Sequence, residues 1–336
     1  MSPPFKTEAL RAYLKNLGLL TNALEIHSLV GGQSNPTYKI TSGNNHFVLR
    51  KKPSGKLLPS AHAIDREYRV MQALAQTQVP VPKMLAFCED DSIVGTPFYL
   101  MSFLEGRVFN DQSLPQLNPS ERHAIYQDMN RVVAAIHSVD YKAIGLENFG
   151  KPGNYFSRQV GRWSRQVQDS TIPIPEALIK LIEWLPNHIP ADDETTLVHG
   201  DFRLDNLVFD ATENRVIGVL DWELSTLGHP MADFSYQCMA WRIPPSLWRG
   251  IGGLNLTELG IPSEQEYIEW YELHTGRKAS THWNFYMAYN FFRIAAILHG
   301  VAQRAVDGNA SASDAAENGQ KAGQLAEIGL SCVGIS

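Results

Sequence analysis

The sequence predicts an α+β protein with two lobes, a small strand-rich N-terminal lobe over residues 1–104 and a larger, mostly helical C-terminal lobe over residues 105–336. In the N-terminal third, hydrophobic and polar positions alternate, which is typical of strands. Beyond it, hydrophobic positions recur every three to four residues over long segments, which is typical of amphipathic helices. The change of period falls within MSFLEG (101–106), which we expect to join the two lobes.

The N-terminal lobe is predicted to contain an antiparallel sheet. The sequence is strand-rich through LEIHSLV, GGQSNPTYKIT and HFVLRKK, and VPVPKMLAFCED and TPFYLMSFLEG read as two more strands. In HFVLRKK, Phe47 and Leu49 alternate with Val48 and Arg50. Successive side chains of a strand point to opposite faces, so these two pairs should face different surroundings.

A helix is predicted over residues 59–76 between those strands. One face of it is apolar except for a single carboxylate, and its members are Ile64, Glu67, Met71 and Leu74. A carboxylate within an apolar stripe needs a cation. Arg50 is the first candidate, because its planar guanidinium can meet both Glu67 and a phosphate. Lys52, on the same side of the strand, is the second. The alternative is that Glu67 lies at the edge of the stripe in water.

Helix-start signals mark the C-terminal lobe. Asn118 with Pro119 predicts an N-cap and first helical residue, and Ser263 with Glu266 predicts a capping box. The most apolar long window, residues 285–302, contains polar residues and predicts a buried core helix rather than a membrane span.

Composition narrows the class of protein. The chain has 29 basic and 35 acidic residues, a formal net charge of −6, and nucleic-acid or membrane binding would call for a basic face. The three cysteines are far apart and show no disulfide or zinc pattern, and the N-terminus lacks the apolar run of a signal peptide. We therefore expect a cytoplasmic protein that binds neither nucleic acid nor membrane, and the sequence leaves its oligomeric state open.

The segment LVHGDFRLDNLVFD (197–210), with VLDWE (219–223) after it, concentrates polar side chains at the ends of strands. A hairpin would bring Asn206 and Asp221 to the same end of a sheet. One amide oxygen and one carboxylate suit a magnesium ion, which typically takes its remaining ligands from water and substrate phosphates. Asp201 would then be left to accept a hydroxyl proton. This order of residues is the one described for kinase active sites.

The segment GGQSNPTYKI (31–40) predicts a phosphate-binding turn, in which backbone N–H groups around Gly31, Gly32 and Ser34 meet phosphate oxygens. It lacks the G-x-G-x-x-G of protein kinases. On its own it is an ordinary turn signal.

LVHGDFRLDNLVFD with VLDWELSTLGHPMADFSY, which contain the motifs HGD and LDWE, resembles the aminoglycoside phosphotransferase and choline kinase-like family; with GGQSNPTYKI and FFRIAAILHGVAQRA, which carry a narrower resemblance, the likeness extends over roughly residues 25–305. More narrowly, the chain resembles the kinase-like domain that is fused to acyl-CoA dehydrogenases in some proteins. The resemblance implies a two-lobed protein-kinase-like fold and use of ATP, or in some members GTP, with Mg²⁺.

The same resemblance implies a role for each matching residue. Asp201 would be the catalytic base, and Asn206 and Asp221 the magnesium ligands. Arg50 would replace the usual lysine beside Glu67. Within 101–106, Ser102, Phe103 and Leu104 would form the hinge on which adenine stacks. His199 would brace the catalytic loop, and Asp233 would hold the segment after Asp221.

The phosphoryl acceptor is the open question. An acid-rich helix with Glu264, Glu266, Glu269 and Glu272 would suit the cations of an aminoglycoside- or choline-type kinase. A row of Arg158, Arg162 and Arg165 would suit an anion, and both sets are otherwise solvated faces. With the resemblance, an anionic hydroxyacyl-type metabolite is the favoured acceptor. Two rival functions remain, a non-catalytic nucleotide-binding module and a metal-dependent hydrolase using His199, Asp201, Asp221 and His229.

Overall fold

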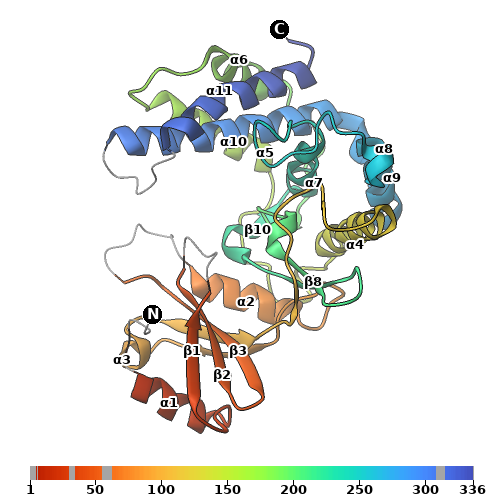
Figure 1. Cartoon of the computed structure of the whole chain (residues 1–336). Coiled ribbons are helices and arrows are strands. Elements are labelled where there is room, and N and C mark those ends of the chain that lie inside the picture. The colour runs from red at the N-terminus through yellow and green to blue at the C-terminus, as the bar shows by residue number, and fades with distance from the viewer. Residues whose placement is uncertain (1–4, 6, 30–34, 55–62, 308–314, 336) are drawn as a thin grey trace. The chain divides into compact units, whose positions relative to one another are not determined.

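The computed structural model describes residues 5, 7–29, 35–54, 63–307 and 315–335, without the side chains of 315, 316 and 318. The chain divides into two compact units (Figure 1). The first consists of Met1–Val108, Lys142–Leu146 and Asn206–Ser225, and the second of the three segments Phe109–Tyr141, Glu147–Asp205 and Thr226–Ser336. The first boundary between the units, after Val108, lies close to the segment 101–106 that was expected to join the lobes. The hairpin that carries Asn206 and Asp221 belongs to the first unit, although the sequence placed it in the C-terminal lobe.

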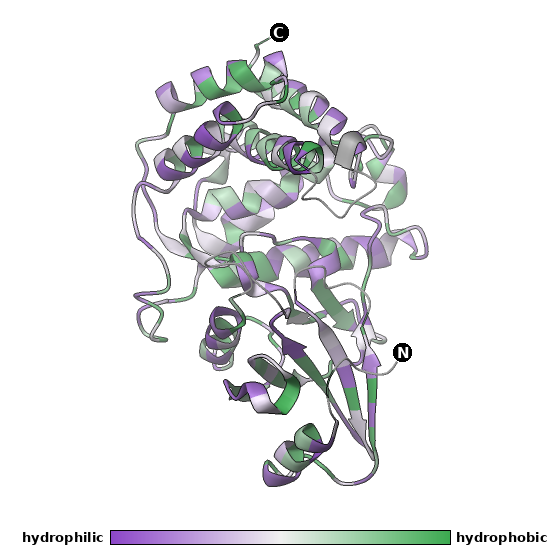
Figure 2. Ribbon diagram, turned by 90° about the vertical axis from the view of Figure 1, so that its left-hand side faces the viewer, coloured by the Kyte–Doolittle hydropathy of each residue, from purple (hydrophilic) through white to green (hydrophobic). Residues whose placement is uncertain are grey.

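The first unit contains a five-stranded antiparallel sheet in the order β1-β2-β3-β5-β4. Its strands are β1 (Leu24–Ser28), β2 (Thr37–Ser42), β3 (Asn45–Lys51), β4 (Met84–Cys88) and β5 (Phe98–Ser102). Hydrophobic and hydrophilic residues alternate along several strands (Figure 2). Three helices accompany the sheet, α1 (Thr7–Asn16), α2 (Ile64–Leu74) and α3 (Asp91–Val94). The sheet and the helix between its strands confirm the expected elements.

Strand β3 is buried on both faces over most of its length. Phe47 and Leu49 join the core cluster that includes Leu10 and Leu14 of α1. Arg50 is buried as well, only 9% exposed, on the face opposite Leu49. A polar side chain at such a position requires partners, which α2 and a second hairpin supply.

That second hairpin belongs to a three-stranded sheet of order β6-β8-β9. Its strands are β6 (Gly106–Arg107), β8 (Leu207–Asp210) and β9 (Val216–Val219). The short 3-10 turn η2 (Leu204–Asn206) precedes β8, and η3 (Trp222–Leu224) follows β9. The helix α2 packs against η3.

The second unit is mostly helical, as expected. Its α-helices are α4 (Pro119–His137), α5 (Tyr155–Gln168), α6 (Glu176–Trp184), α7 (Pro230–Cys238), α8 (Leu256–Leu259), α9 (Glu264–Thr275), α10 (Trp283–Val306) and α11 (Ala315–Cys332). The other elements are β7 (Thr196–Val198), which pairs antiparallel with β10 (Thr226–Gly228), and the 3-10 turns η1 (Leu185–Asn187), η4 (Met239–Trp241) and η5 (Ala279–His282).

Both predicted helix starts are confirmed. The side chain of Asn118 accepts from Glu121 N and Pro119 is the first residue of α4, while Ser263 and Glu266 form the capping box of α9. Helix α10, which covers the apolar window, packs against α5, α7 and α11 as a core helix. Within the described part of the chain, no helix combines the length and the apolar character needed to cross a bilayer.

Candidate functional site

Asn206 and Asp221 lie directly beyond the paired ends of β8 and β9. Leu207 pairs with Val219, and Leu220 N donates to Asn206 O at 2.8 Å. The hairpin therefore brings an amide and a carboxylate to one end of the ladder, as the sequence predicts. Asp221 has a positive φ of 63°, which non-glycine residues adopt at a cost, so the turn into η3 holds this carboxylate in a constrained position.

Arg50 connects α2 to that hairpin. Its Nε lies 3.0 Å from Glu67 Oε2, and its Nη2 donates to Asp221 Oδ1 at 2.7 Å. Tyr99 OH also donates to Glu67 Oε2, at 3.2 Å. Glu67 is fully buried, so the alternative of a water-exposed edge position is wrong. Burial raises the pKa of the Glu67 carboxyl, and Arg50 opposes that rise.

Lys52, the second candidate partner, does not take this position. Its described hydrogen bonds are those of its backbone, where Lys52 N donates to Pro97 O at 3.0 Å and its carbonyl accepts from Thr96 Oγ1 at 2.7 Å. The buried lysine of the strand is Lys51, whose Nζ donates to Val94 O. Arg50 is therefore the cation that meets Glu67.

The expected hinge residues lie at the end of β5, where Ser102 is the last residue of the strand and Phe103 and Leu104 follow it. Ser102 Oγ accepts from Lys83 N at 2.9 Å, and Lys39 Nζ lies 4.0 Å from the centroid of the Phe103 ring. A Cβ on Gly218 of β9 would come within 2.1 Å of Leu104 Cδ1, so this strand needs glycine where Leu104 crosses it. Sequence reasoning missed Gly218, although a glycine inside VIGVLDWE signals a close approach. Gly31, Gly32 and Ser34 lie outside the described residues.

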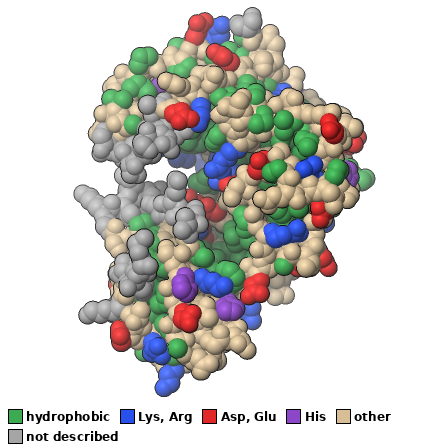
Figure 3. All heavy atoms as spheres, in the orientation of Figure 1, with side chains coloured by type: hydrophobic (Ala, Val, Ile, Leu, Met, Phe, Trp, Pro, Cys, Tyr) green, Lys and Arg blue, Asp and Glu red, His purple; other side chains and the backbone are tan. Residues whose placement is uncertain are grey.

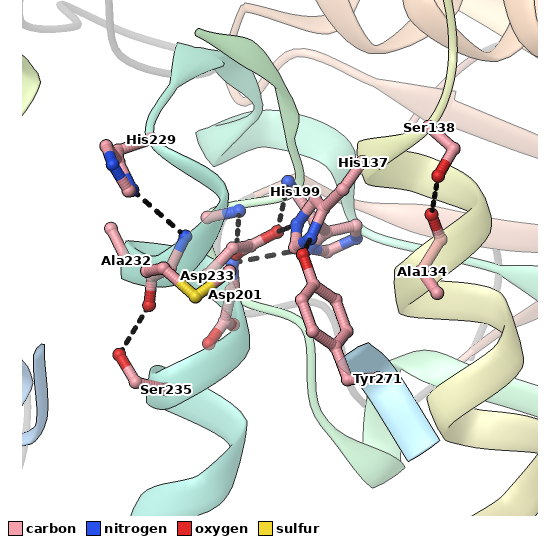
Figure 4. Close-up of polar contacts among 12 residues, drawn as sticks. Ala134, His137, Ser138, His199, Asp201, His229, Ala232, Asp233, Ser235 and Tyr271 are labelled. Carbon is pink, nitrogen blue, oxygen red and sulfur yellow. Dashed lines mark hydrogen bonds and ion pairs between the residues drawn. The ribbon is translucent and has the colours of Figure 1, made fainter. Parts of the chain in front are cut away.

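Asp201 belongs to the second unit, in a segment fixed by a buried carboxylate. Asp233 of α7 accepts from His199 N at 2.7 Å and from Gly200 N at 2.8 Å (Figure 4). His137 Nε2 lies 3.2 Å from Asp233 Oδ2 and its Nδ1 lies 2.7 Å from Tyr271 OH. The backbone before Asp201 is thus held by a fully buried polar network.

That network differs from the expected one in one respect. Asp233 was expected to hold the segment after Asp221, whereas its carboxylate bonds the backbone of residues 199–200. Burial raises the pKa of Asp233, but His137 and His199, through their charge and hydrogen bonds, outweigh it and the pKa is lowered overall. His199 braces the loop as expected, because its Nδ1 accepts from Asp201 N at 3.2 Å.

The side chain of Asp201 is held at both oxygens. Tyr236 OH donates to Oδ1 at 2.7 Å, and Arg203 Nε donates to Oδ2 at 3.1 Å. Arg293 of α10 donates to Gly200 O at 2.9 Å, and its guanidinium lies over the Tyr236 ring. Sequence reasoning missed these three residues. The D-x-R spacing of Asp201 and Arg203 is a usable signal, whereas nothing in the sequence marks Tyr236.

The two histidines proposed as ligands of a metal-dependent hydrolase make structural hydrogen bonds instead. His229 Nδ1 caps α7 by accepting from Met231 N, and His199 Nδ1 is used by Asp201 N. Within the described residues, no group of three or more His, Cys, Asp or Glu side chains is arranged to hold a metal ion. The three cysteines are free and buried. The structure gives the hydrolase hypothesis no support.

The acid-rich face of α9 is largely used in structural contacts. Glu264 pairs with Arg242 at 3.0 Å, Glu266 closes the capping box, Glu269 accepts from Gln265, and Glu272 accepts from Ser280. On the face shown in Figure 3, basic and acidic side chains are interspersed rather than gathered by sign. Of these carboxylates, only Glu264 is paired with a cation among the described residues, and the others accept hydrogen bonds from neutral groups.

The arginine row on α5 behaves mostly as a solvated face. Arg162 and Arg165 are exposed, and Arg158 Nη2 donates to Lys151 O at 2.7 Å. The row remains on one side of a helix, as its spacing predicts. Its three side chains do not converge on one point through any described contact.

Comparison with known proteins gives one family and a set of longer relatives. The family described as "Phosphotransferase enzyme family" matches residues 25–257. The chain is 51% identical to mouse acyl-CoA dehydrogenase family member 10 over 96% of this chain and 30% of the relative. It is 46% identical to the probable acyl-CoA dehydrogenase IBR3 of Arabidopsis thaliana, over 89% of this chain and 39% of the relative. The chain thus spans less than half the length of these relatives.

Solved structures give the fold. A crystal structure from Ralstonia eutropha JMP134, provisionally assigned to the aminoglycoside phosphotransferases, matches with a TM-score of 0.90 and 52% identity over 98% of both chains. A thermostable mutant of aminoglycoside phosphotransferase APH(4)-Ia, in complex with ADP and hygromycin B, matches with a TM-score of 0.63 at 16% identity over 96% of this chain and 99% of that one. The predicted protein-kinase-like α+β fold is confirmed.

Proposed function

Because this chain belongs to the phosphotransferase enzyme family, we propose that it moves the γ-phosphoryl group of ATP, or of GTP, to a hydroxyl of a small molecule. Asp201 is the base in this proposal. The observation that supports it most is the fixation of this carboxylate, with donors on both oxygens and a loop backbone held by buried Asp233. A base must be positioned before its proton affinity matters.

The hairpin end supplies the remaining polar groups. Asn206 and Asp221 would hold Mg²⁺, and their amide and carboxylate oxygens fit its preference for hard oxygen donors. A cation held there would neutralise negative charge that develops on the phosphoryl group during transfer. Arg50 keeps Asp221 in place and also provides a guanidinium for nucleotide phosphates. Glu67 fixes Arg50 from the helix side.

Adenine would stack at the hinge formed by Ser102, Phe103 and Leu104, and the turn around Gly31, Gly32 and Ser34 would contribute backbone N–H groups to the phosphates. Nucleotide use is supported by the fold neighbours, one of which was solved with ADP and another, an aminoglycoside 2'-phosphotransferase, with GDP.

The proposed acceptor is an anionic, hydroxylated small molecule of hydroxyacyl type. The longer relatives are named as acyl-CoA dehydrogenases, which supports an acyl-type compound. The alternative is an aminoglycoside- or choline-type kinase, and the pairing of Glu264 with Arg242 leaves one carboxylate of α9 fewer for its cation. Three free, buried cysteines support the expectation of a reducing, cytoplasmic location.

A panel of hydroxyl compounds assayed by nucleoside-diphosphate release tests the proposal. We expect one class of anionic hydroxy compound to stimulate release in a magnesium-dependent way. If nucleotide binds but no compound stimulates release, the second alternative, a non-catalytic nucleotide-binding module, replaces the proposal.

A further inference from the structure

A small cavity lies in the second unit, beside the residues that hold Asp201. Its volume is about 50 Å³. Its lining includes Arg203, Asp205, Tyr236, Trp248 and Arg249. Two of these, Tyr236 and Arg203, are the donors to the Asp201 carboxylate. The cavity is therefore lined by two residues that hold the proposed catalytic base.

The charged wall of the cavity has more donors than acceptors. Arg203 Nη1 and Arg249 Nη1 lie 3.1 Å and 2.8 Å from the same oxygen of Asp205. A guanidinium carries five N–H donors. The ion pairs with Asp201 and Asp205 occupy one nitrogen each on Arg203, and the pair with Asp205 occupies one on Arg249. Arg203 therefore already serves two carboxylates, whereas Arg249 serves one and keeps the larger share of its N–H donors for a further oxyanion.

The rest of the lining is mostly neutral. Trp248, Met239 and Ile243 provide apolar surface, and Asn110 and Gln112 provide amides. A cavity of this volume has room for a compact polar group such as a carboxylate or phosphate. The Arg249 side chain is 51% exposed, so a ligand can enter without displacing a buried element.

We propose that this cavity anchors the anionic end of the acceptor, with Arg203 and Arg249 as its cationic donors and Asp205 as their counter-ion. The inference rests on the proposed function and names a recognition site within it. Arginine forks recognise carboxylate and phosphate oxygens with two parallel hydrogen bonds. An oxyanion bound here lies next to Arg203, which also touches Asp201, so the acceptor would be anchored on the same unit as the base. In the arginine row of α5, by contrast, no described contact brings two guanidinium groups to the same point.

The kinetic test uses Arg249→Gln, because Arg249 does not contact Asp201 in any described hydrogen bond. The matched control is Arg215→Gln, which removes an arginine of similar exposure, 58% against 51%, that also pairs with one carboxylate. Acceptors are compared as pairs, each hydroxy acid with its neutral amide. We expect Arg249→Gln to raise KM for the acid about tenfold or more, on the scale of a charge-assisted hydrogen bond. KM for the amide, KM for the nucleotide and kcat should not change, and neither should any constant of Arg215→Gln.

Three outcomes overturn the inference. In the first, Arg249→Gln behaves as the wild type towards both members of a pair. In the second, KM for the nucleotide rises instead, so the arginine contacts nucleotide phosphate. In the third, Arg165→Gln on α5 produces the effect and Arg249→Gln does not.

An equilibrium measurement separates this inference from the proposed function. Inorganic phosphate and acetate are each titrated at constant ionic strength while thermal unfolding is followed, since a ligand that binds the folded state raises Tm. We expect a larger Tm increase for wild type and Arg215→Gln than for Arg249→Gln. This result with no phosphoryl transfer would reject the proposed function and keep the anion site. Equal Tm increases in all three proteins would reject the site even if transfer occurs.

Discussion

The guanidinium of Arg50 lies 3.0 Å from the carboxylate of Glu67, where both side chains are almost completely withdrawn from water. One residue comes from β3 and the other from α2, and Asp221 of a separate hairpin binds the same guanidinium at 2.7 Å. Arginine suits this position because its planar fork can serve two carboxylates at once, which the point charge of lysine does less well.

Removal of either partner should destabilise the protein. Arg50→Ala leaves Glu67 buried without its cation, and breaking a buried pair in this way costs about 3–5 kcal/mol. Chemical denaturation followed by circular dichroism measures the loss. Arg215→Ala, which breaks an exposed pair, should cost less than about 1 kcal/mol. A loss for Arg50→Ala as small as that of the control would contradict the structural role of the pair.

Acid should destabilise the protein through His229. Burial lowers the pKa of His229 from 6.5 to about 4. The unfolded chain therefore binds a proton between these values that the folded protein does not, so the free energy of unfolding falls as pH decreases from about 6.5 to 4. The contribution is on the order of 1–3 kcal/mol. Burial lowers the pKa of His137 as well, with the same sign.

His229→Asn separates this titration from the cap of α7. Asparagine is a good N-cap residue and can accept from Met231 N in place of the imidazole. We expect the variant to remain folded and to show a shallower loss of stability across the same pH range, measured by urea unfolding at several pH values. Identical slopes for the two proteins would show that His229 is not the titrating group.

Tyr236 should act as a positioning residue for Asp201. Tyr236→Phe removes one of the two donors to the carboxylate and keeps the ring that packs under Arg293. Turnover should fall about tenfold to a hundredfold, on the scale of one lost hydrogen bond to a charged group. KM for nucleotide and acceptor should stay the same in steady-state assays. A rise in KM at unchanged kcat would indicate that Tyr236 binds substrate instead.

Asp221 should determine the response to magnesium. Asp221→Ala is expected to abolish the dependence of nucleotide affinity on magnesium concentration, because it removes the carboxylate of the proposed ligand pair. Asp210→Asn is the control, since Asp210 ends β8 at the turn end of the same hairpin and accepts from Glu213 N within that turn. If Asp221→Ala responds to magnesium as the control does, Asp221 is not a ligand.

Local signals in the sequence were sufficient for much of this fold. The caps at Asn118 and Ser263, the apolar face of α2 and the pairing that juxtaposes Asn206 and Asp221 all depend on short spacings, and the structure confirms each. Such features depend on hydrogen bonds and periodicity within a few residues.

Contacts between distant segments were harder to predict. Asp233 bonds the backbone of residues 199–200, thirty-odd positions earlier, and no spacing rule links the two. Arg293 stands out in the sequence as a charged residue within an apolar helix, but nothing in the sequence identifies Gly200 as its partner. Tyr236 looks like any aromatic core residue until α7 is placed beside Asp201. Tertiary packing decides these contacts, so they required the structure.

Replacement of Asp201 by asparagine tests the central claim most directly. Asp201→Asn preserves the shape and size of the side chain, but an amide cannot accept the hydroxyl proton. Bases of this kind raise the reaction rate about 10²–10⁴-fold. We predict that single-turnover phosphoryl transfer to the best acceptor of the hydroxyl panel falls by that factor while nucleotide affinity, measured by equilibrium titration, is unchanged. Transfer at a near wild-type rate in Asp201→Asn would contradict the assignment of Asp201 as the base.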